Sequence, residues 1–541
     1  MKVTLLVSGI SVSAFCEDAE TQACTEALCR LRNARILSRM GVSPEVYVYR
    51  RAVDARKKRD IRFVYTVAVR GDGLPIEATK LPNGVSVCED TVPLVQMGSH
   101  PLAHRPIVVG SGPAGLFASL LLAENGYRPI LLERGGSVAE RSRAISSFYE
   151  TRTLDPDTNV QFGAGGAGTF SDGKLVTRIS DPYARYVFER FLEFGAPKEI
   201  MTLAKPHIGT DLLQGIVRRM LSRIESLGGE VRYHTKLTDI RIHDGAICAV
   251  NTTGGELPCD ALILAIGHSA RDTYEMCLTK PFSIEAKPFS VGMRIEHLQS
   301  DIDFGMYGDY AGHPKLSHAE YTLSTHVGGR GVYTFCMCPG GMVMAASSEE
   351  GGVVVNGMSY HARDGKNANA AVLVSVTRED YGGTPQGAIA FQRRIEQAAF
   401  SVGGGDYAAP TVTVGDFLSG ECKEEPKRVL PTYMDGRGVR LALPDHYLPT
   451  FVTDSIKAAL PVFGQKIAGY DAHDAVLCGA ETRTSAPLRI LRSENRMAIG
   501  VHGVYPAGEG AGYAGGITSA ALDGLRSALA LCAYFAPSIH E

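Results

Sequence analysis

The stretch from Ile107 to Glu133 constrains the fold of this chain more than any other segment. An apolar run at 107–109 is followed by the pattern G-x-G-x-x-G over 110–115, a helix-forming run at 116–125 and a second apolar run at 130–132. This order of strand, glycine turn, helix and strand is typical of a βαβ unit that binds a dinucleotide. An acidic residue, Glu133, follows the last glycine by 18 positions. The spacing therefore predicts a Rossmann-like unit.

Each position of this glycine turn has its own physical reason. Gly110 permits the tight turn, Gly112 lets a diphosphate approach the backbone, and Gly115 lets the helix pack closely on the strand. The phosphates are expected at the helix N-terminus, where unpaired N–H groups favour an anion. Glu133 is expected to accept hydrogen bonds from the ribose hydroxyls and to repel a 2′-phosphate, which favours FAD or NAD over NADP; the alternative is a glycine turn without a ligand. The predicted cofactor-binding residues here are Gly110, Gly112, Pro113, Ala114, Gly115, Glu133 and Arg134.

Two more glycine loops match the same short pattern without forming a second Rossmann unit. The loop at 163–168 is followed by no helix-forming run, and the loop at 510–515 leaves only 26 residues of chain. Backbone-rich loops of this kind can lie against a flat ligand or an anion, because glycine has no side chain to obstruct them. We therefore expect Gly168 and Thr169 to contact the cofactor.

The C-terminal part of the sequence favours FAD over NAD. A strand near 503–507 leads into Gly508 and Glu509, and a small-residue helix opens at Gly516 and Ile517. The N-terminus of that helix would stabilise negative charge on a reduced flavin. A buried strand at 261–266 ends in Gly267, as expected of a further crossing of the flavin domain. FAD is thus the predicted cofactor, and its predicted contacts here are Gly267, Gly508, Glu509, Gly516 and Ile517. NAD(P)H is expected to bind only transiently.

The predicted fold class is α/β. Strand-like alternation at 46–49 and 61–69, after a helix from about Asp18 to Leu37, indicates a small N-terminal α+β domain. Alternation with Gly and Pro punctuation indicates an inserted antiparallel sheet in the middle of the chain, with a helix near Gln386 to Phe400. The predicted domains are 1–98 (N-terminal α+β), 99–286 (first part of a Rossmann-like FAD-binding domain), 287–460 (inserted substrate domain) and 461–541 (C-terminal return to the FAD-binding domain).

Composition excludes several classes of protein. The net charge is only -3, with 21% charged and 45% hydrophobic residues, which disfavours disorder and whole-surface nucleic-acid binding. No apolar run approaches the length of a membrane span, so no membrane partner is expected. The 12 cysteines contain no C-x-x-C pair, which indicates free thiols in a reducing compartment. We therefore expect a cytoplasmic protein without a cysteine-bound metal.

Longer motifs carry a resemblance to a known family. Residues 159–162 running into the second glycine loop, and residues 169–175 after it, together with the motifs at 289–297, 333–341, 355–360, 481–487 and 508–516, resemble the uncharacterised FAD-dependent dehydrogenases. The resemblance extends from about residue 45 to the end of the chain. It implies a glutathione-reductase-like FAD fold with an inserted antiparallel-sheet domain, and it implies FAD binding by Gly110, Gly112, Gly115, Glu133, Gly168, Gly267 and Glu509. It implies no substrate.

Three side chains are candidates for catalysis, each with a structural alternative. Lys174 follows the second glycine loop, where its ammonium would stabilise an anionic reduced flavin or a substrate oxyanion, unless it binds the FAD diphosphate or faces solvent. Arg483 would contact substrate or flavin, unless it forms an ion pair with Glu481. His268 follows the strand end at Gly267 and would donate a proton beside the flavin, unless it is a structural histidine. Cys336 and Cys338 are interpreted as packing in the core.

The predicted function is that of an FAD-dependent oxidoreductase that transfers a hydride between flavin and a small organic substrate. A second hypothesis is an FAD-dependent enzyme that modifies RNA and docks it on the basic turn at 50–59. A third is a flavin redox sensor without turnover. Under the first hypothesis the basic turn is a solvated hairpin connection, and nucleic acid is not a partner.

Overall fold

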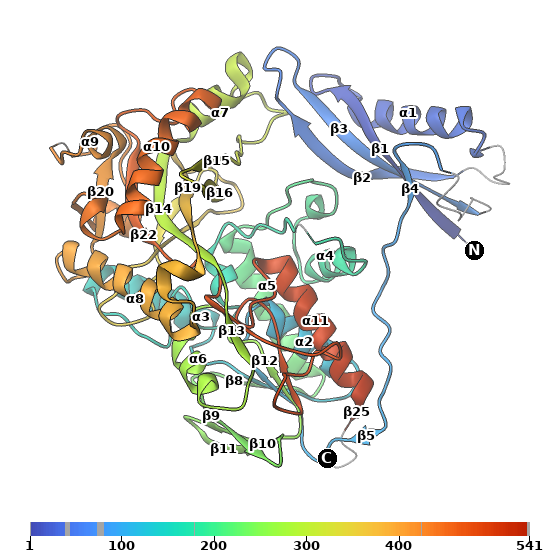
Figure 1. Ribbon diagram of the computed structural model, residues 1–541. Coiled ribbons are helices and arrows are strands. Elements are labelled where there is room, and N and C mark those ends of the chain that lie inside the picture. The colour runs from blue at the N-terminus through green and yellow to red at the C-terminus, as the bar shows by residue number, and fades with distance from the viewer. Residues whose placement is uncertain (1, 38–43, 73–80, 178, 424, 538–541) are drawn as a thin grey trace.

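The chain begins with a small antiparallel sheet that carries one helix on its face (Figure 1). The computed structural model describes residues 2–37, 44–72, 81–177, 179–423 and 425–537. The strands β1 (Lys2–Ser13), β2 (Glu45–Asp54), β3 (Arg62–Asp72) and β4 (Val85–Val87) lie in the order β2-β3-β1-β4, with α1 (Ala19–Asn33) against them. Alternate residues of β3 are buried, and α1 buries alanines and a leucine four residues apart, so two regular periodicities form this core.

The N-terminal sheet is joined to the rest of the molecule by a long connecting segment and by direct contacts. In Figure 1 the chain runs from β4 down to β5 (His100–Pro101), which pairs in parallel with β25 (Phe535–Ala536). The backbone of Arg51 bonds to Thr202 O at 2.6 Å and to Ala204 N at 2.8 Å.

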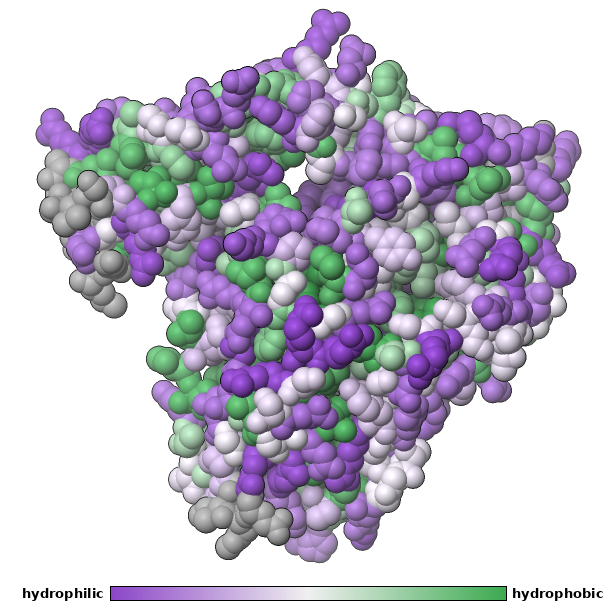
Figure 2. All heavy atoms as spheres, turned by 180° about the vertical axis from the view of Figure 1, so that it is seen from behind, coloured by the Kyte–Doolittle hydropathy of each residue, from purple (hydrophilic) through white to green (hydrophobic). Residues whose placement is uncertain are grey.

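Seen from behind, mainly hydrophilic residues cover the surface of the molecule, with small apolar patches (Figure 2). The basic turn between β2 and β3 is an exposed connection in which Arg56 pairs with Asp54.

A five-stranded parallel sheet forms the centre of the FAD-binding part predicted from the sequence. Its strands are β6 (Ile107–Val109), β7 (Ile130–Leu132), β8 (Glu230–Arg232), β12 (Leu262–Leu264) and β24 (Val504–Pro506), in the order β24-β12-β6-β7-β8. Each neighbouring pair is parallel. The three apolar runs that the sequence predicted to be strands, at 107–109, 130–132 and 261–266, all contribute to this sheet, and the predicted α/β class is confirmed.

Both faces of the parallel sheet are covered, which explains why its strands are apolar throughout. Val108, Leu131 and Ile263 pack toward helices α2 (Pro113–Glu124), α5 (Thr210–Ser226) and α11 (Ile517–Tyr534). The alternate residues Ile107 and Val109 join a second core with the antiparallel strands β9 (Leu237–His243), β10 (Ala246–Thr252) and β11 (Gly255–Pro258). Helix α2 begins three residues before its predicted apolar run, because proline is favoured at the first helical position.

A seven-stranded sheet forms the inserted domain. Its strands are β14 (Phe289–Leu298), β15 (Ser324–Val327), β16 (Arg330–Cys338), β19 (Asn367–Val376), β20 (Ala409–Thr413), β21 (Val439–Leu441) and β22 (Val476–Glu481), in the order β15-β16-β19-β14-β22-β20-β21. All neighbours are antiparallel except β20 and β21. The sheet extends beyond residue 460, where the sequence placed the end of this domain, because β22 pairs with both β14 and β20. The predicted helix near 386–400 is present as α8 (Pro385–Val402).

The remaining elements connect these sheets. The helices are α3 (Val138–Thr151), α4 (Ala184–Glu193), α6 (Arg271–Leu278), α7 (Gln299–Tyr307), α9 (Val414–Ser419) and α10 (Thr450–Lys466). The strands β13 (Ile284–Ala286) and β23 (Leu488–Ile490) form one pair, and β17 (Met342–Ala345) and β18 (Val355–Met358) form another. Short 3₁₀ helices span Ala167–Phe170, Lys198–Met201, Gly308–Tyr310, Arg378–Tyr381, Tyr433–Gly436 and Pro444–His446. Among the described helices, none is long and apolar enough to span a membrane.

Candidate flavin site

A cavity of about 400 Å³ lies between the parallel sheet and the inserted domain. One wall is formed by the residues that follow the carboxyl ends of β6, β7, β12 and β24, which is where α/β sheets bind their ligands. The opposite wall comes from β16 and from residues 320–322, with Glu481 at the end of β22 and Arg483 after it. The cavity therefore collects segments that lie more than 350 residues apart in sequence.

Two helix N-termini open onto this cavity. Helix α2 starts after Gly112 and helix α11 starts after Gly516, and neither helix has a side chain that caps its first N–H groups. Both glycines line the cavity. Uncapped N–H groups and the positive end of the helix dipole attract an anion. The cavity can thus bind negatively charged groups at two places, the N-termini of α2 and α11.

The glycines of the first turn differ in their roles. A Cβ at Gly110, where φ is +95°, would lie 2.3 Å from Ala265 O, and a Cβ at Gly115 would lie 1.8 Å from Gly110 O. These two glycines are required for close packing of backbone on backbone. A Cβ at Gly112 would instead meet Gly166 Cα at 3.8 Å, an ordinary contact. Gly112 is therefore open toward the cavity, and the cradle that it forms with Gly166 fits a diphosphate.

The carboxylate of Glu133 is held by the protein itself. Its Oε2 accepts from Ser111 N at 3.0 Å and from Ser111 Oγ, and its Oε1 accepts from the backbone N–H groups of Gly135 and Gly163, both at 3.0 Å. These bonds tie the first glycine loop to the second. The predicted contact between Glu133 and the ribose stays a prediction, and it requires the ribose hydroxyls to share a carboxylate that already accepts four bonds.

Most of the residues predicted to bind the cofactor are brought together at the cavity. Those that line it are Gly110, Gly112, Pro113, Ala114, Glu133, Arg134, Gly168, Lys174, Gly267, Glu509, Gly516 and Ile517. Three do not line it. Gly115 and Gly508 pack behind it, since a Cβ at Gly508 would lie 2.7 Å from Ala114 Cβ. Thr169 is buried in the 3₁₀ helix Ala167–Phe170, and its carbonyl accepts from Thr210 Oγ1 at 2.6 Å.

Glu509 lies in a low-dielectric part of the cavity. Burial raises the pKa of this carboxyl to about 7, although the ammonium of Lys287 acts in the opposite direction. None of the hydrogen bonds found among the described residues involves its side chain, so nothing in the protein compensates for the loss of water around the carboxylate. Near neutral pH the carboxyl is partly protonated and can donate or accept a hydrogen bond.

Glu509→Gln is expected to stabilise the FAD-free protein at neutral and alkaline pH. Because the folded-state pKa is raised, the ionised carboxylate opposes folding, and this cost is absent below about pH 4.5 and grows until the pH passes about 7. The gain at pH 8 should be on the order of 2 kcal/mol. Urea unfolding at pH 5 and pH 8 measures it. A stability difference between variant and wild type that is the same at both pH values would contradict the assignment.

Lys174 lies at the cavity wall in an ion pair. Its Nζ is 2.7 Å from Asp172 Oδ2, and Asp172 is also bound by Arg363 at 2.6 Å. Burial lowers the pKa of Lys174, but the carboxylates of Asp172 and Glu320 outweigh burial and raise it. The ammonium is thus charged at all physiological pH values and has donors left for a bound molecule.

His268 is a buried histidine with one free ring nitrogen. Burial, together with the positive charges of Arg483 and Arg271, lowers its pKa to about 4, so the ring is neutral at pH 7. The Arg483 backbone bonds to the ring, and Nε2 has no hydrogen-bond partner among the residues that the structure describes. His268 lines the cavity, but its Nε2 is buried and without a partner, so a bound molecule reaches this nitrogen only if the ring turns.

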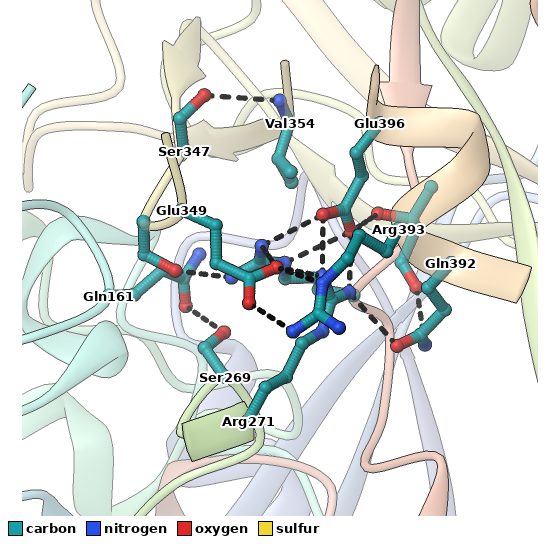
Figure 3. A network of polar contacts seen from close by, with 12 residues as sticks. Gln161, Ser269, Arg271, Ser347, Glu349, Val354, Gln392, Arg393 and Glu396 are labelled. Atoms are coloured by element: carbon teal, nitrogen blue, oxygen red, sulfur yellow. Dashed lines mark hydrogen bonds and ion pairs between the residues drawn. The ribbon is translucent and has the colours of Figure 1, made fainter. Parts of the chain in front are cut away.

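Arg483 also reaches the cavity, but its guanidinium belongs to a buried ionic network. Figure 3 shows Arg271 and Glu396 of this network. Arg483 pairs with Glu396 of α8 at 2.9 Å and donates to Ser348 Oγ. Glu396 binds Arg271 of α6 as well, at 2.7 Å. The predicted alternative pair between Arg483 and Glu481 is wrong, because Glu481 binds Arg294 at 2.7 Å.

Sequence reasoning missed several groups of the cavity wall. Glu320 and Tyr321 line it without any motif that signals them, and Asp172 lines it from within the motif at 169–175, to which no role was assigned. Cys336 also lines it, whereas only Cys338 is packed in the core as the sequence indicated. Alternation along the strand could not have found Cys336, because the register shifts between Phe335 and Cys338.

Comparisons with known proteins agree on the cofactor. A family model described as the FAD-dependent protein, C-terminal domain-like, matches residues 288–484, and one described as the FAD binding domain matches residues 105–158. An uncharacterized protein of Clostridium beijerinckii is 45% identical over 486 residues, which cover 89% of this chain and 91% of that protein.

Solved structures are more distant. CtdE in complex with FAD is 12% identical, with a TM-score of 0.30 over 77% of this chain and 82% of that one. FqzB is 12% identical, with a TM-score of 0.32 over 80% of this chain and 76% of that one. No reaction is inferred from likenesses at this level.

Proposed function

The chain belongs to the family of FAD-dependent proteins that share this C-terminal domain, and from that premise we propose that it transfers a hydride between bound FAD and a small organic substrate. When bound, FAD supplies the redox chemistry, while the protein supplies orientation and electrostatics. The observation that carries the proposal is the meeting of two uncapped helix N-termini and three glycine-rich loops at one cavity.

The N-terminus of α2 and the glycine loop at 163–168 would hold the diphosphate. Gly112 and Gly166 leave the necessary space, and the first N–H groups of α2 provide donors. The N-terminus of α11, at Gly516 and Ile517, would stabilise negative charge that develops when the flavin is reduced. Glu509, at the end of the return strand, would bond to hydroxyl groups of the cofactor.

The opposite wall would receive the substrate. It offers the ammonium of Lys174 as a fixed positive charge, and the neutral ring of His268 in the same wall as the proton acceptor once the ring turns its buried Nε2 toward the substrate. The inserted domain closes this side with Tyr321 and with β16. Closure excludes water, which strengthens every charge interaction inside the cavity. This arrangement suits a small polar molecule better than a polymer.

Anaerobic reduction of the bound flavin tests the proposal. Wild-type protein is mixed without oxygen with NADH, NADPH and a panel of small metabolites, and the loss of visible flavin absorption is followed. At least one compound should bleach the flavin with saturation. His268→Ala should retain FAD and bleach about 100-fold more slowly with that compound, whereas His104→Ala, at an exposed position, should behave as wild type. If the flavin bleaches at the same rate in His268→Ala and His104→Ala, then His268 has no part in the reaction. If no compound bleaches the flavin, the proposal of turnover is contradicted.

A further inference from the structure

Strand β16 contains a bulge at its cavity end. Phe335 pairs with Ala371 and Cys338 pairs with Asn369, so Cys336 and Met337 together stand opposite one residue of β19. Cys336 has a φ of +43°, the left-handed region that side chains other than glycine rarely adopt. Bulges commonly redirect a side chain next to a functional site. Here the bulge presents Cys336 to the cavity, while Cys338 stays fully buried behind it.

The two cysteines contact each other. The Cys338 thiol donates to Cys336 O at 3.3 Å. The guanidinium of Arg294 binds the same unit, with Nη1 at 3.1 Å from Cys336 O and 3.8 Å from Cys338 Sγ. Both cysteines are free thiols in this structure. A pair of thiols in contact, with one at a cavity wall, can close a disulfide if the bulge adjusts.

The surroundings of the two cysteines give their thiols different pKa values. The adjacent Cys338 side chain, together with the positive charges of Arg294 and Lys174, lowers the pKa of Cys336 to about 6 against the effect of burial. The adjacent Cys336 side chain, together with burial, raises the pKa of Cys338. At neutral pH the cavity-facing sulfur is therefore a thiolate and the buried sulfur a thiol, which is the division between an attacking and a resolving cysteine.

We propose that Cys336 and Cys338 are a redox-active pair that passes two electrons to FAD in the same cavity. This inference rests on the proposed function, because it requires oxidised FAD as the acceptor. The Cys336 thiolate and the Cys338 thiol together lose two electrons and one proton, the proton of Cys338, as one S–S bond forms between them. The two electrons and this proton reduce FAD, so no proton is left over. The reverse step restores the two thiols at the expense of reduced FAD.

Reductive titration of the FAD-loaded protein tests this inference. After mild oxidation and removal of oxygen, wild-type protein should consume four electrons per FAD, two for the flavin and two for the disulfide. Cys336→Ser and Cys338→Ala should each consume two electrons. Cys248→Ser, at an exposed cysteine, should consume four. Wild-type protein that takes up only two electrons, with every thiol still open to alkylation, would overturn the proposal.

Mapping of the disulfide separates this proposal from the cofactor assignment. Differential alkylation followed by mass spectrometry, on wild-type protein with and without FAD in a thiol–disulfide buffer, should find the peptide that contains Cys336 and Cys338 lighter by two hydrogens. The same peptide should stay reduced in the Cys338→Ala variant. A disulfide that forms in the buffer but is not reduced when FAD is reduced would overturn the electron transfer. If the disulfide forms in the buffer but the protein binds no FAD, the failure lies in the proposed function and not in the cysteine pair.

Discussion

Gly112→Val is expected to release FAD from the protein and to leave the fold intact. The backbone of Gly112 has a φ of -68°, which valine adopts freely, and a Cβ there meets no atom closer than 3.8 Å. The valine methyl groups would project from the N-terminus of α2 into the cradle that fits the diphosphate. We expect FAD affinity to fall at least 100-fold, about 2.7 kcal/mol. Fluorescence titration of the protein with FAD measures the affinity.

Stability measurements distinguish loss of binding from loss of folding. The FAD-free Gly112→Val protein should unfold at nearly the same temperature as FAD-free wild type. Gly115→Val should instead prevent folding, because its Cβ would lie 1.8 Å from the carbonyl oxygen of Gly110. If Gly112→Val protein still copurifies with FAD in full amount, the diphosphate does not lie at α2.

Glu396→Ala is expected to destabilise the protein strongly by breaking the buried ionic network beside the cavity. The carboxylate is buried and binds both Arg271 and Arg483, while Thr482 Oγ1 donates to it at 2.6 Å. Its removal leaves two buried guanidinium groups with less compensation, and the loss of one partner of a buried ion pair costs about 3–5 kcal/mol. Urea unfolding at pH 7 measures the change. Glu350→Ala, at the exposed neighbour of Glu349, should change stability by less than about 0.5 kcal/mol.

The pH dependence gives a second test of the same network. The two arginines hold the pKa of Glu396 well below its usual range, despite its burial. A carboxylate with a depressed pKa stabilises the folded state at neutral pH, and this contribution declines as the pH falls below the ordinary value of about 4.5. The stability difference between wild type and Glu396→Ala should therefore shrink between pH 5 and pH 3. A difference that stays constant over this interval would show that the ion pairs are not its cause.

The parts of the fold that depend on local sequence were predictable. Strands β6 and β7 and the start of α2 follow from apolar runs and glycine positions within thirty residues, and the small-residue helix α11 follows in the same way. The spacing of the first glycine turn predicted FAD or NAD, and the C-terminal strand and helix favoured FAD. FAD is confirmed by the family to which the chain belongs. Local patterns predict such elements because their stabilising contacts lie within the pattern.

The chemistry of the opposite wall was not predictable in the same way. Arg483 lies two residues from Glu481, yet it pairs with Glu396 on a helix far away in sequence. The packing of α8 against β22 determines which carboxylate pairs with Arg483. Cys336 was interpreted as a core residue because its strand reads as apolar, and the bulge that turns it into the cavity leaves no mark in the sequence. Long-range packing and backbone irregularities of this kind appear only in three dimensions.

Hydrogen exchange of the protein with and without FAD tests the central claim most directly, which is that one FAD joins glycine loops that lie far apart in sequence. On binding of FAD, the backbone amides of residues 110–115, 163–168 and 515–517 should all exchange more slowly. The amides of β10 and β11, which are away from the cavity, should be unchanged. Slower exchange in only one of the three loops, or in none of them, would contradict the site described above.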